Sequence, residues 1–248
     1  MTATLPEQLD GLLARKEALA RRAAVDPDLA QRLSAVRAWQ AERLAGTYED
    51  LRRDPRHTAA VEFFLTDLYG PQASLTRDRE LRRAWEPLKR GLPAQVLEVL
   101  ARALELDALS GELDEAVARH LPPGPISGGG YAEAYRACGQ AAARERQIAL
   151  IRCIGEDLDR AVRLPGVGLA LRAARLPTHW AGFGVLHDFL ERGYHAFRNM
   201  QGAQQLLSRI EERETRMMRE LFAGARDPLA AALATPASTP QAPCDEPR

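Results

Sequence analysis

The sequence predicts an all-α protein, an irregular multi-helix bundle of about eight to ten helices with a central apolar helix and a disordered C-terminal tail. Leucine, which favours helices, occurs 35 times, against 9 valines, 5 isoleucines and 10 threonines, which favour strands. No segment shows the apolar alternation of a strand bounded by hairpin turns. Prolines and glycines recur where helices would start and end, so we expect no sheet.

The first 53 residues are expected to form two helices. A helical pattern over residues 5–24 ends where Asp26 supplies an N-cap and Pro27 the first position of the next helix. This second helix runs to about Arg53. We therefore predict N-terminal helices over residues 1–53 and a core helical domain over residues 54–226.

The core domain begins with the clearest helix of the sequence. Asp54 and Pro55 repeat the start signal, apolar residues follow at helical spacing to Leu68, and Gly70 with Pro71 stops the run. Successive residues step about 100° around a helix. The adjacent Phe63 and Phe64 therefore point in different directions, and this helix should be buried on two sides.

Later segments show the same pattern. A break is expected at Ser110-Gly111, and the Pro/Gly-rich residues 122–130 read as an internal loop. Between Ile148 and Ile154 the helix is apolar nearly all the way round, which is typical of a core helix. Residues 227–248 are rich in proline and alanine and are predicted to form the disordered tail. Helices are expected over residues 77–90, 93–110, 113–121, 131–164, 167–176, 183–200 and 203–222.

Composition excludes several classes of function. Hydrophobic residues make up 46% and charged residues 27%, which is globular composition. The 34 basic and 34 acidic residues balance, which argues against a nucleic-acid partner. No run approaches the roughly 20 apolar residues of a bilayer span, so no membrane partner is expected. The N-terminus lacks the pattern of an export signal, and we expect a cytoplasmic protein.

Cysteines and motifs suggest no cofactor. Cys138, Cys153 and Cys244 have neither the spacing of a zinc site nor that of a disulfide framework. Glycines in residues 122–130 lack the order of a phosphate loop, and no common enzyme motif occurs. The sequence therefore leans against an enzyme.

Three residues are candidates for ligand binding. Arg152 interrupts the apolar stretch, so its guanidinium should pair with a carboxylate such as that of Asp67 or Glu62, or anchor an anionic ligand. His57 lies near the apolar face of the helix that contains Phe63, where it should be partly buried. A structural role is the simpler reading of both residues.

A weaker candidate is a metal site on the helix over residues 183–200. His187, Glu191 and His195 lie at positions i, i+4 and i+8, a spacing that aligns potential ligands on one helix. The line falls away from the predicted apolar face, so we expect a solvent-exposed polar face, with a metal site as the alternative.

Three segments resemble an uncharacterised family of all-helical bacterial proteins that share an F-F-L-x-x-L-Y-G-P motif. They are FFLTDLYGP at 63–71, ERQIALI at 145–151 and DFLERG at 188–193. The resemblance covers about residues 44–210. It implies a helical fold and a bacterial origin, and it carries no catalytic residue.

Two functions remain open. Balanced charge and absent motifs favour a non-enzymatic helical protein that binds another protein or self-associates. Such a protein should expose an apolar stripe on an outer helix. The alternative is a bundle that binds a small anionic or apolar ligand, possibly an enzyme, which requires a cavity with converging polar groups.

Overall fold

The computed structural model describes residues 4–68, 73–91 and 94–224. Within these ranges the fold is all-α, without strands, which confirms the predicted fold class. The predicted end of the helix that contains Phe63, at Gly70 and Pro71, lies outside the described residues. The predicted tail at 227–248 also lies outside them. The elements are α1 (Leu5–Val25), α2 (Pro27–Thr47), α3 (Glu49–Arg53), α4 (Thr58–Glu62), the π-helical segment η1 (Phe63–Leu68), α5 (Ala73–Gly91), α6 (Ala94–His120), α7 (Gly128–Ala137), α8 (Ala141–Ala161), α9 (Val167–Trp180), α10 (Gly184–Met200) and α11 (Gln204–Phe222).

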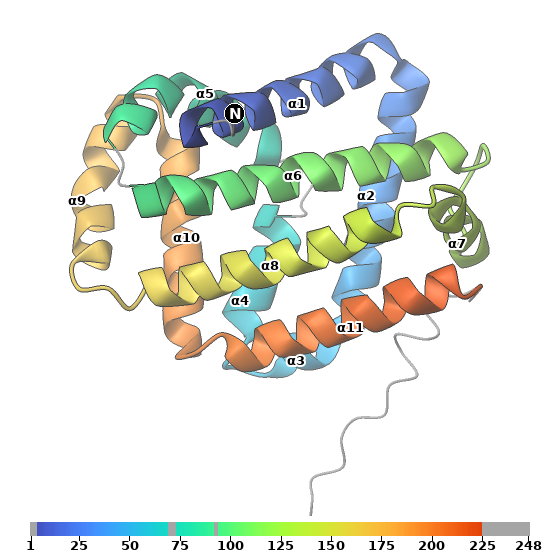
Figure 1. Ribbon diagram of the computed structural model, residues 1–248. Coiled ribbons are helices and arrows are strands. Elements are labelled where there is room, and N and C mark those ends of the chain that lie inside the picture. Colours follow the sequence, from blue (N-terminus) through green and yellow to red (C-terminus); the bar gives the residue numbers. More distant parts are fainter. Residues whose placement is uncertain (1–3, 69–72, 92–93, 225–248) are drawn as a thin grey trace, which may run out of the picture.

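The helices form two crossed layers (Figure 1). Helices α1, α6, α8 and α11 lie side by side in the front layer, and neighbours in this order are in contact. Behind them, α2, α4 and α10 run steeply across the front layer. Helix α9 lies at one end of the molecule against α10, and α7 lies at the opposite end. Helix α8 is central in the front layer, between α6 and α11.

The expected break at Ser110-Gly111 does not occur, because α6 continues through it to His120. The missing side chain of Gly111 serves packing instead. A Cβ atom there would lie 3.1 Å from Cδ1 of Leu19, so the glycine lets α1 approach α6. Ion pairs from Arg15 to Glu112 and from Arg22 to Glu115 join the same two helices.

Other expected helices are divided in the structure. The helix expected over 54–68 changes from α-helical to π-helical geometry at Phe63. The helix expected over 131–164 is interrupted between α7 and α8, where Gly139 has φ +60°. A left-handed residue of this kind ends a helix, and glycine adopts it at little cost.

The core consists of separate clusters, and α11 joins two of them. One cluster surrounds Val36, Val117 and Tyr131, and the other surrounds Phe197 and Leu206. Met217 and Met218 of α11 belong to the first cluster, whereas Leu206 and Leu207 belong to the second. Both clusters are therefore completed by the same C-terminal helix.

We predict that a methyl group at Gly155 destabilises the protein, whereas one at Gly11 does not. A Cβ atom at Gly155 would overlap the buried side chain of Leu207, so Gly155→Ala should cost about 1–3 kcal/mol of unfolding free energy. No atom lies within 4 Å of a Cβ atom at Gly11, so Gly11→Ala should stabilise α1 by about 0.5–1 kcal/mol. Urea unfolding of both variants tests this, and a change of the same sign in both would contradict the close α8–α11 packing.

Candidate functional site

A cavity of about 70 Å³ lies between the two layers, where the two core clusters meet. This is several times the roughly 10–15 Å³ that one water molecule needs. The wall has a polar part and a larger apolar part. The polar lining residues are Gln40, Arg43, Tyr48, Tyr131, Tyr135, Arg144, Gln147 and Glu214. The apolar lining residues are Leu44, Val61, Phe64, Leu65, Ile148, Ile151, Leu206, Ile210, Met217, Met218 and Leu221.

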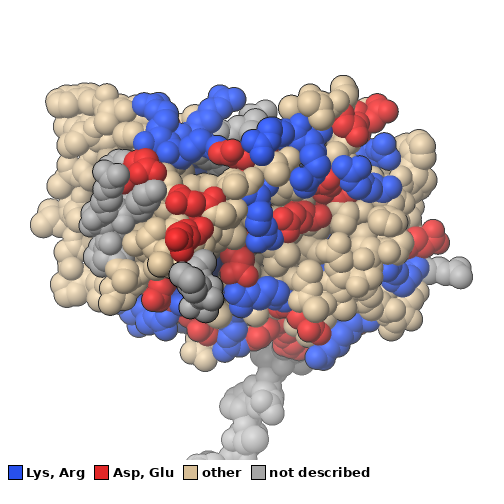
Figure 2. Space-filling view, turned by 45° about the horizontal axis from the view of Figure 1, so that its top comes forward, with Lys and Arg blue, Asp and Glu red and all other residues tan. Residues whose placement is uncertain are grey.

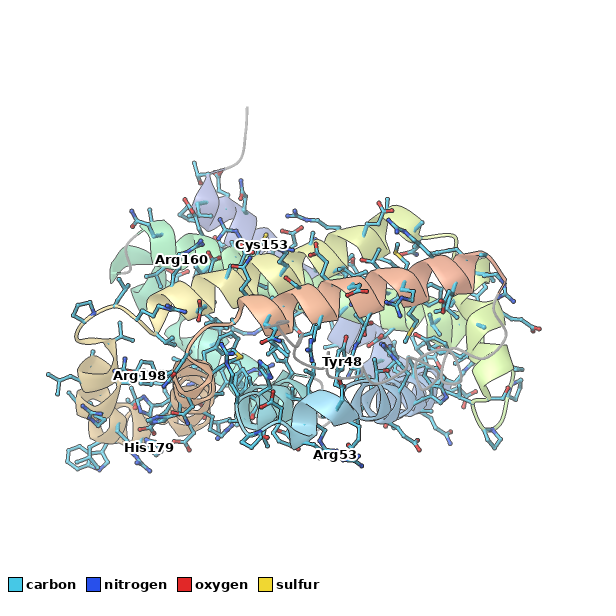
Figure 3. All side chains as sticks on the ribbon, turned by 90° about the horizontal axis from the view of Figure 1, so that it is seen from below. Tyr48, Arg53, Cys153, Arg160, His179 and Arg198 are labelled. Atoms are coloured by element: carbon cyan, nitrogen blue, oxygen red, sulfur yellow. The ribbon has the colours of Figure 1, made fainter. Side chains whose placement is uncertain are left out.

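One side of the cavity is formed by a buried ion pair between the layers. The guanidinium of Arg43 on α2 donates to both carboxylate oxygens of Glu214 on α11, at 2.7 and 2.9 Å. The hydroxyl of Tyr48 donates to the same carboxylate at 2.7 Å. Figure 3 shows Tyr48 below α11, between the two layers. The charge of Glu214 is thus already satisfied by the protein.

The pKa values of these groups follow from their burial and contacts. Burial alone would lower the pKa of Arg43, but the nearby Glu214 carboxylate raises it by more, and the net pKa lies above its ordinary value. Burial raises the pKa of Tyr48 well above its ordinary value, and Glu214 raises it further. Tyr48 therefore remains a hydrogen-bond donor at neutral pH.

Arg144 on α8 brings a second buried guanidinium to the cavity. Arg144 is 7% exposed. It donates to Oε1 of Gln147 at 3.3 Å and lies 4.6 Å from the ring centroid of Tyr135. No carboxylate of the described residues lies within 4.0 Å of it.

Asp114 is the acidic residue that interacts electrostatically with Arg144. Burial raises its pKa, and Arg144 and Arg37 oppose that shift. The carboxylate is engaged elsewhere, because it accepts a 2.6 Å hydrogen bond from Gln40 and lies 3.7 Å from Arg37. Arg144 therefore keeps hydrogen-bonding capacity that the described residues do not use.

Tyr131 and Tyr135 on α7 add two further donors. The ring of Tyr131 stacks on Trp39 at 3.9 Å, and the two tyrosine rings are 5.9 Å apart. Burial raises the pKa of both hydroxyl groups. Neither hydroxyl group hydrogen-bonds to a described residue. Both hydroxyl oxygens remain accessible to water-sized molecules. Together with Arg144 they give the cavity more donors than acceptors.

The structure does not bring the three predicted ligand-binding residues together, and none lines this cavity. Arg152 lies on the outer face of α8 with its side chain 34% exposed, and it pairs with Glu156 and Glu211. The expected partner Asp67 instead accepts from Arg192 at 2.9 Å. The apolar stretch thus has one solvent-facing side, because α8 has neighbours on both flanks of its layer but none in front.

His57 is more buried than expected, at 1% exposure. Its Nδ1 lies 2.8 Å from Oδ2 of Asp54. Its Nε2 has no hydrogen-bond partner among the described residues. The backbone carbonyl of His57 accepts from the N–H of Val61, which belongs to the second core cluster.

The three potential metal ligands do not share one environment. The expected exposure is wrong for His187, which is 3% exposed because α9 and α5 pack against this part of α10. Glu191 lies 3.8 Å from Arg175 of α9, and His195 is exposed. In the described part of the chain, no three His, Cys, Asp or Glu side chains are arranged to hold a metal ion.

Sequence reasoning missed Arg43, Arg144 and Glu214. Each is a charged residue in an amphipathic helix, like many others that face solvent, and only the fold shows that these three face inward. One signal was present. Tyr131 and Tyr135 lie one turn apart and face the same way, so a shared polar contact could have been sought there.

The chain belongs to the family described as Domain of unknown function (DUF8198), which it matches over residues 19–228. The match begins within α1 and therefore extends beyond the 44–210 range of the sequence resemblance. No curated protein and no solved structure matches the chain. In addition, none of the described helices has the length and apolar character needed to cross a bilayer.

We predict that the ion pair of Arg43 and Glu214 is strongly coupled. Removing one partner leaves a buried charge unpaired, so Arg43→Met or Glu214→Gln should each cost about 3–5 kcal/mol of unfolding free energy. The double variant should recover a large part of that loss. A matched control is the exposed pair Arg152–Glu211, whose coupling should stay below about 1 kcal/mol. Denaturant unfolding of both double-mutant cycles measures the coupling, and equal values would contradict this assignment.

Proposed function

We propose that this protein binds a small organic anion, with a carboxylate head and a short apolar body, in the cavity between the two helix layers. The observation that carries the proposal is Arg144. It is a buried guanidinium on the cavity wall, and no carboxylate of the described residues pairs with it.

The energetics of a buried cation support an anionic ligand. Removing a charge from water costs several kcal/mol unless an opposite charge and hydrogen bonds compensate. Proteins usually meet this cost by pairing, as Arg43 does with Glu214. A bound carboxylate would give Arg144 the same compensation, in the bidentate geometry that a guanidinium favours.

The neighbouring groups fit a carboxylate in the same place. The hydroxyls of Tyr131 and Tyr135 remain protonated and can donate to its oxygens. Glu214 would repel an anion less than a free carboxylate would, because Arg43 and Tyr48 already neutralise and bind it.

The size and the apolar wall limit the rest of the ligand. A volume of about 70 Å³ suits a compact molecule and excludes one of drug size. Side chains such as Leu44, Ile148 and Met218 would cover a short aliphatic body. Because a cavity of about 150 Å³ is needed to hold benzene, acetate and propionate are reasonable probes of this class.

Protein interaction was the other function favoured by the sequence. A different part of the molecule supports it, the outward face of α9, and it does not compete with ligand binding in the cavity. Both functions are compatible with one protein.

We predict that small carboxylates raise the thermal stability of the full chain and that Arg144→Met abolishes the effect. A ligand at 100 times its Kd should add about 2.7 kcal/mol. Differential scanning fluorimetry with acetate, propionate and phosphate, each against chloride at equal ionic strength, measures the shift, and calorimetric titration gives Kd.

The matched control is Arg152→Met, which removes an arginine from the outer face of the same helix. It should respond to carboxylates as the wild type does. An equal response of Arg144→Met would show that the ligand binds elsewhere. If none of the three anions stabilised the wild type, the proposal would be rejected.

A further inference from the structure

Helix α9 is covered on one side only. It packs against α10, and none of its residues is fully buried. Its large apolar side chains include Leu169 and Leu176, each 64% exposed, and Trp180, which is 83% exposed. The end of the molecule that α9 occupies, at the left in Figures 1 and 2, is formed largely of uncharged residues. Single exposed apolar residues are common, but a contiguous group marks an interaction site.

These side chains form a continuous line along the helix. Leu169, Ala173, Leu176 and Trp180 lie at positions i, i+4, i+7 and i+11, which fall within about 60° of one another at roughly 100° per residue. We call these four residues the α9 stripe. Its spacing matches the face that one helix presents to another in helix-on-helix recognition.

The two flanks of the α9 stripe differ in charge. Helix α9 contains no Asp or Glu. Arg172, Arg175 and His179 lie on one flank, and the other flank carries small apolar residues such as Ala170 and Pro177.

Two of the three basic residues already have acidic neighbours on α10. Arg175 lies 3.8 Å from Glu191, and His179 lies 3.3 Å from Asp188. Arg172 is exposed, and no carboxylate in the described ranges lies within 4.0 Å of it. One cation therefore remains available beside the stripe.

We propose that the α9 stripe docks an amphipathic helix of a different protein, and that this partner helix carries carboxylates along one edge of its apolar face. Its apolar residues would cover Leu169, Leu176 and Trp180, and its acidic edge would pair with Arg172. Tryptophan and arginine are the residue types that most often dominate such interfaces.

A second copy of this chain fits the stripe less well. Pairing two α9 helices antiparallel about a twofold axis brings the two arginine flanks together, and pairing them parallel places each arginine flank against an alanine flank. In neither arrangement does α9 of one molecule supply a carboxylate to Arg172 of the other molecule.

An anionic bilayer also fits less well. Asp188 has a side chain 42% exposed beside the basic flank, where a negatively charged surface would repel it. A partner helix is only about 10 Å wide, so it can place its carboxylates next to Arg172 and away from Asp188.

Two synthetic helical peptides test the proposal with the full-length protein. They share an apolar face of leucines at helical spacing and differ only along one edge, which carries Glu in one peptide and Lys in the other. We expect fluorescence anisotropy to show about tenfold tighter binding of the Glu peptide. Leu176→Asp should abolish binding of both peptides, and Arg172→Glu should reverse the preference.

The matched control is Val25→Ser, which changes an apolar residue that is 83% exposed on α1, outside the stripe. It should bind both peptides as the wild type does. Equal affinity for the two peptides, or binding of neither, would overturn the proposal.

Two other results would also overturn it, and each would identify a different occupant. A dimer in sedimentation velocity that Leu176→Asp dissociates would assign the stripe to a second copy. Co-sedimentation with phosphatidylserine vesicles that Leu176→Asp abolishes would assign it to a lipid surface.

Discussion

The two helix layers of this protein are held together at their centre by a charged contact. Arg43 reaches from α2 to Glu214 on α11, and Tyr48 binds the same carboxylate from the start of α3. A buried ion pair needs a fixed geometry to offset the loss of hydration. It therefore constrains how α2 and α11 lie against each other beside the cavity.

Three arginines show how strongly position decides the role of one residue type. Arg152 on the outside of α8 has two glutamate partners in water, where such pairs contribute little. Arg43 is buried with its partner. Arg144, two turns before Arg152 on the same helix, is buried with no carboxylate of the described residues within 4.0 Å. The difference between the last two separates a structural contact from a candidate binding group.

Most helices could be predicted because their signals are local. Asp26 illustrates this, since its carboxylate accepts from the backbone of Leu29 three residues later, as an N-cap does. Errors arose where a neighbouring helix decided the outcome. Gly111 lets α1 pack closely against α6 and does not break α6. His187 is buried by neighbouring helices, which the sequence of its own helix does not indicate. The cavity could not be predicted at all, because Arg43 and Glu214 are 171 positions apart.

That separation has a consequence for how the chain folds during synthesis. Helix α11 supplies residues to both core clusters, and it is the last of the described helices to leave the ribosome. Until then Arg43 has no Glu214, and the sides of α7 and α8 that pack against α11 have no cover. Contacts so distant in sequence form slowly, because a long loop must close first. The nascent chain thus exposes incomplete core surface until α11 has been translated, the stage at which a partly folded chain is most prone to aggregate.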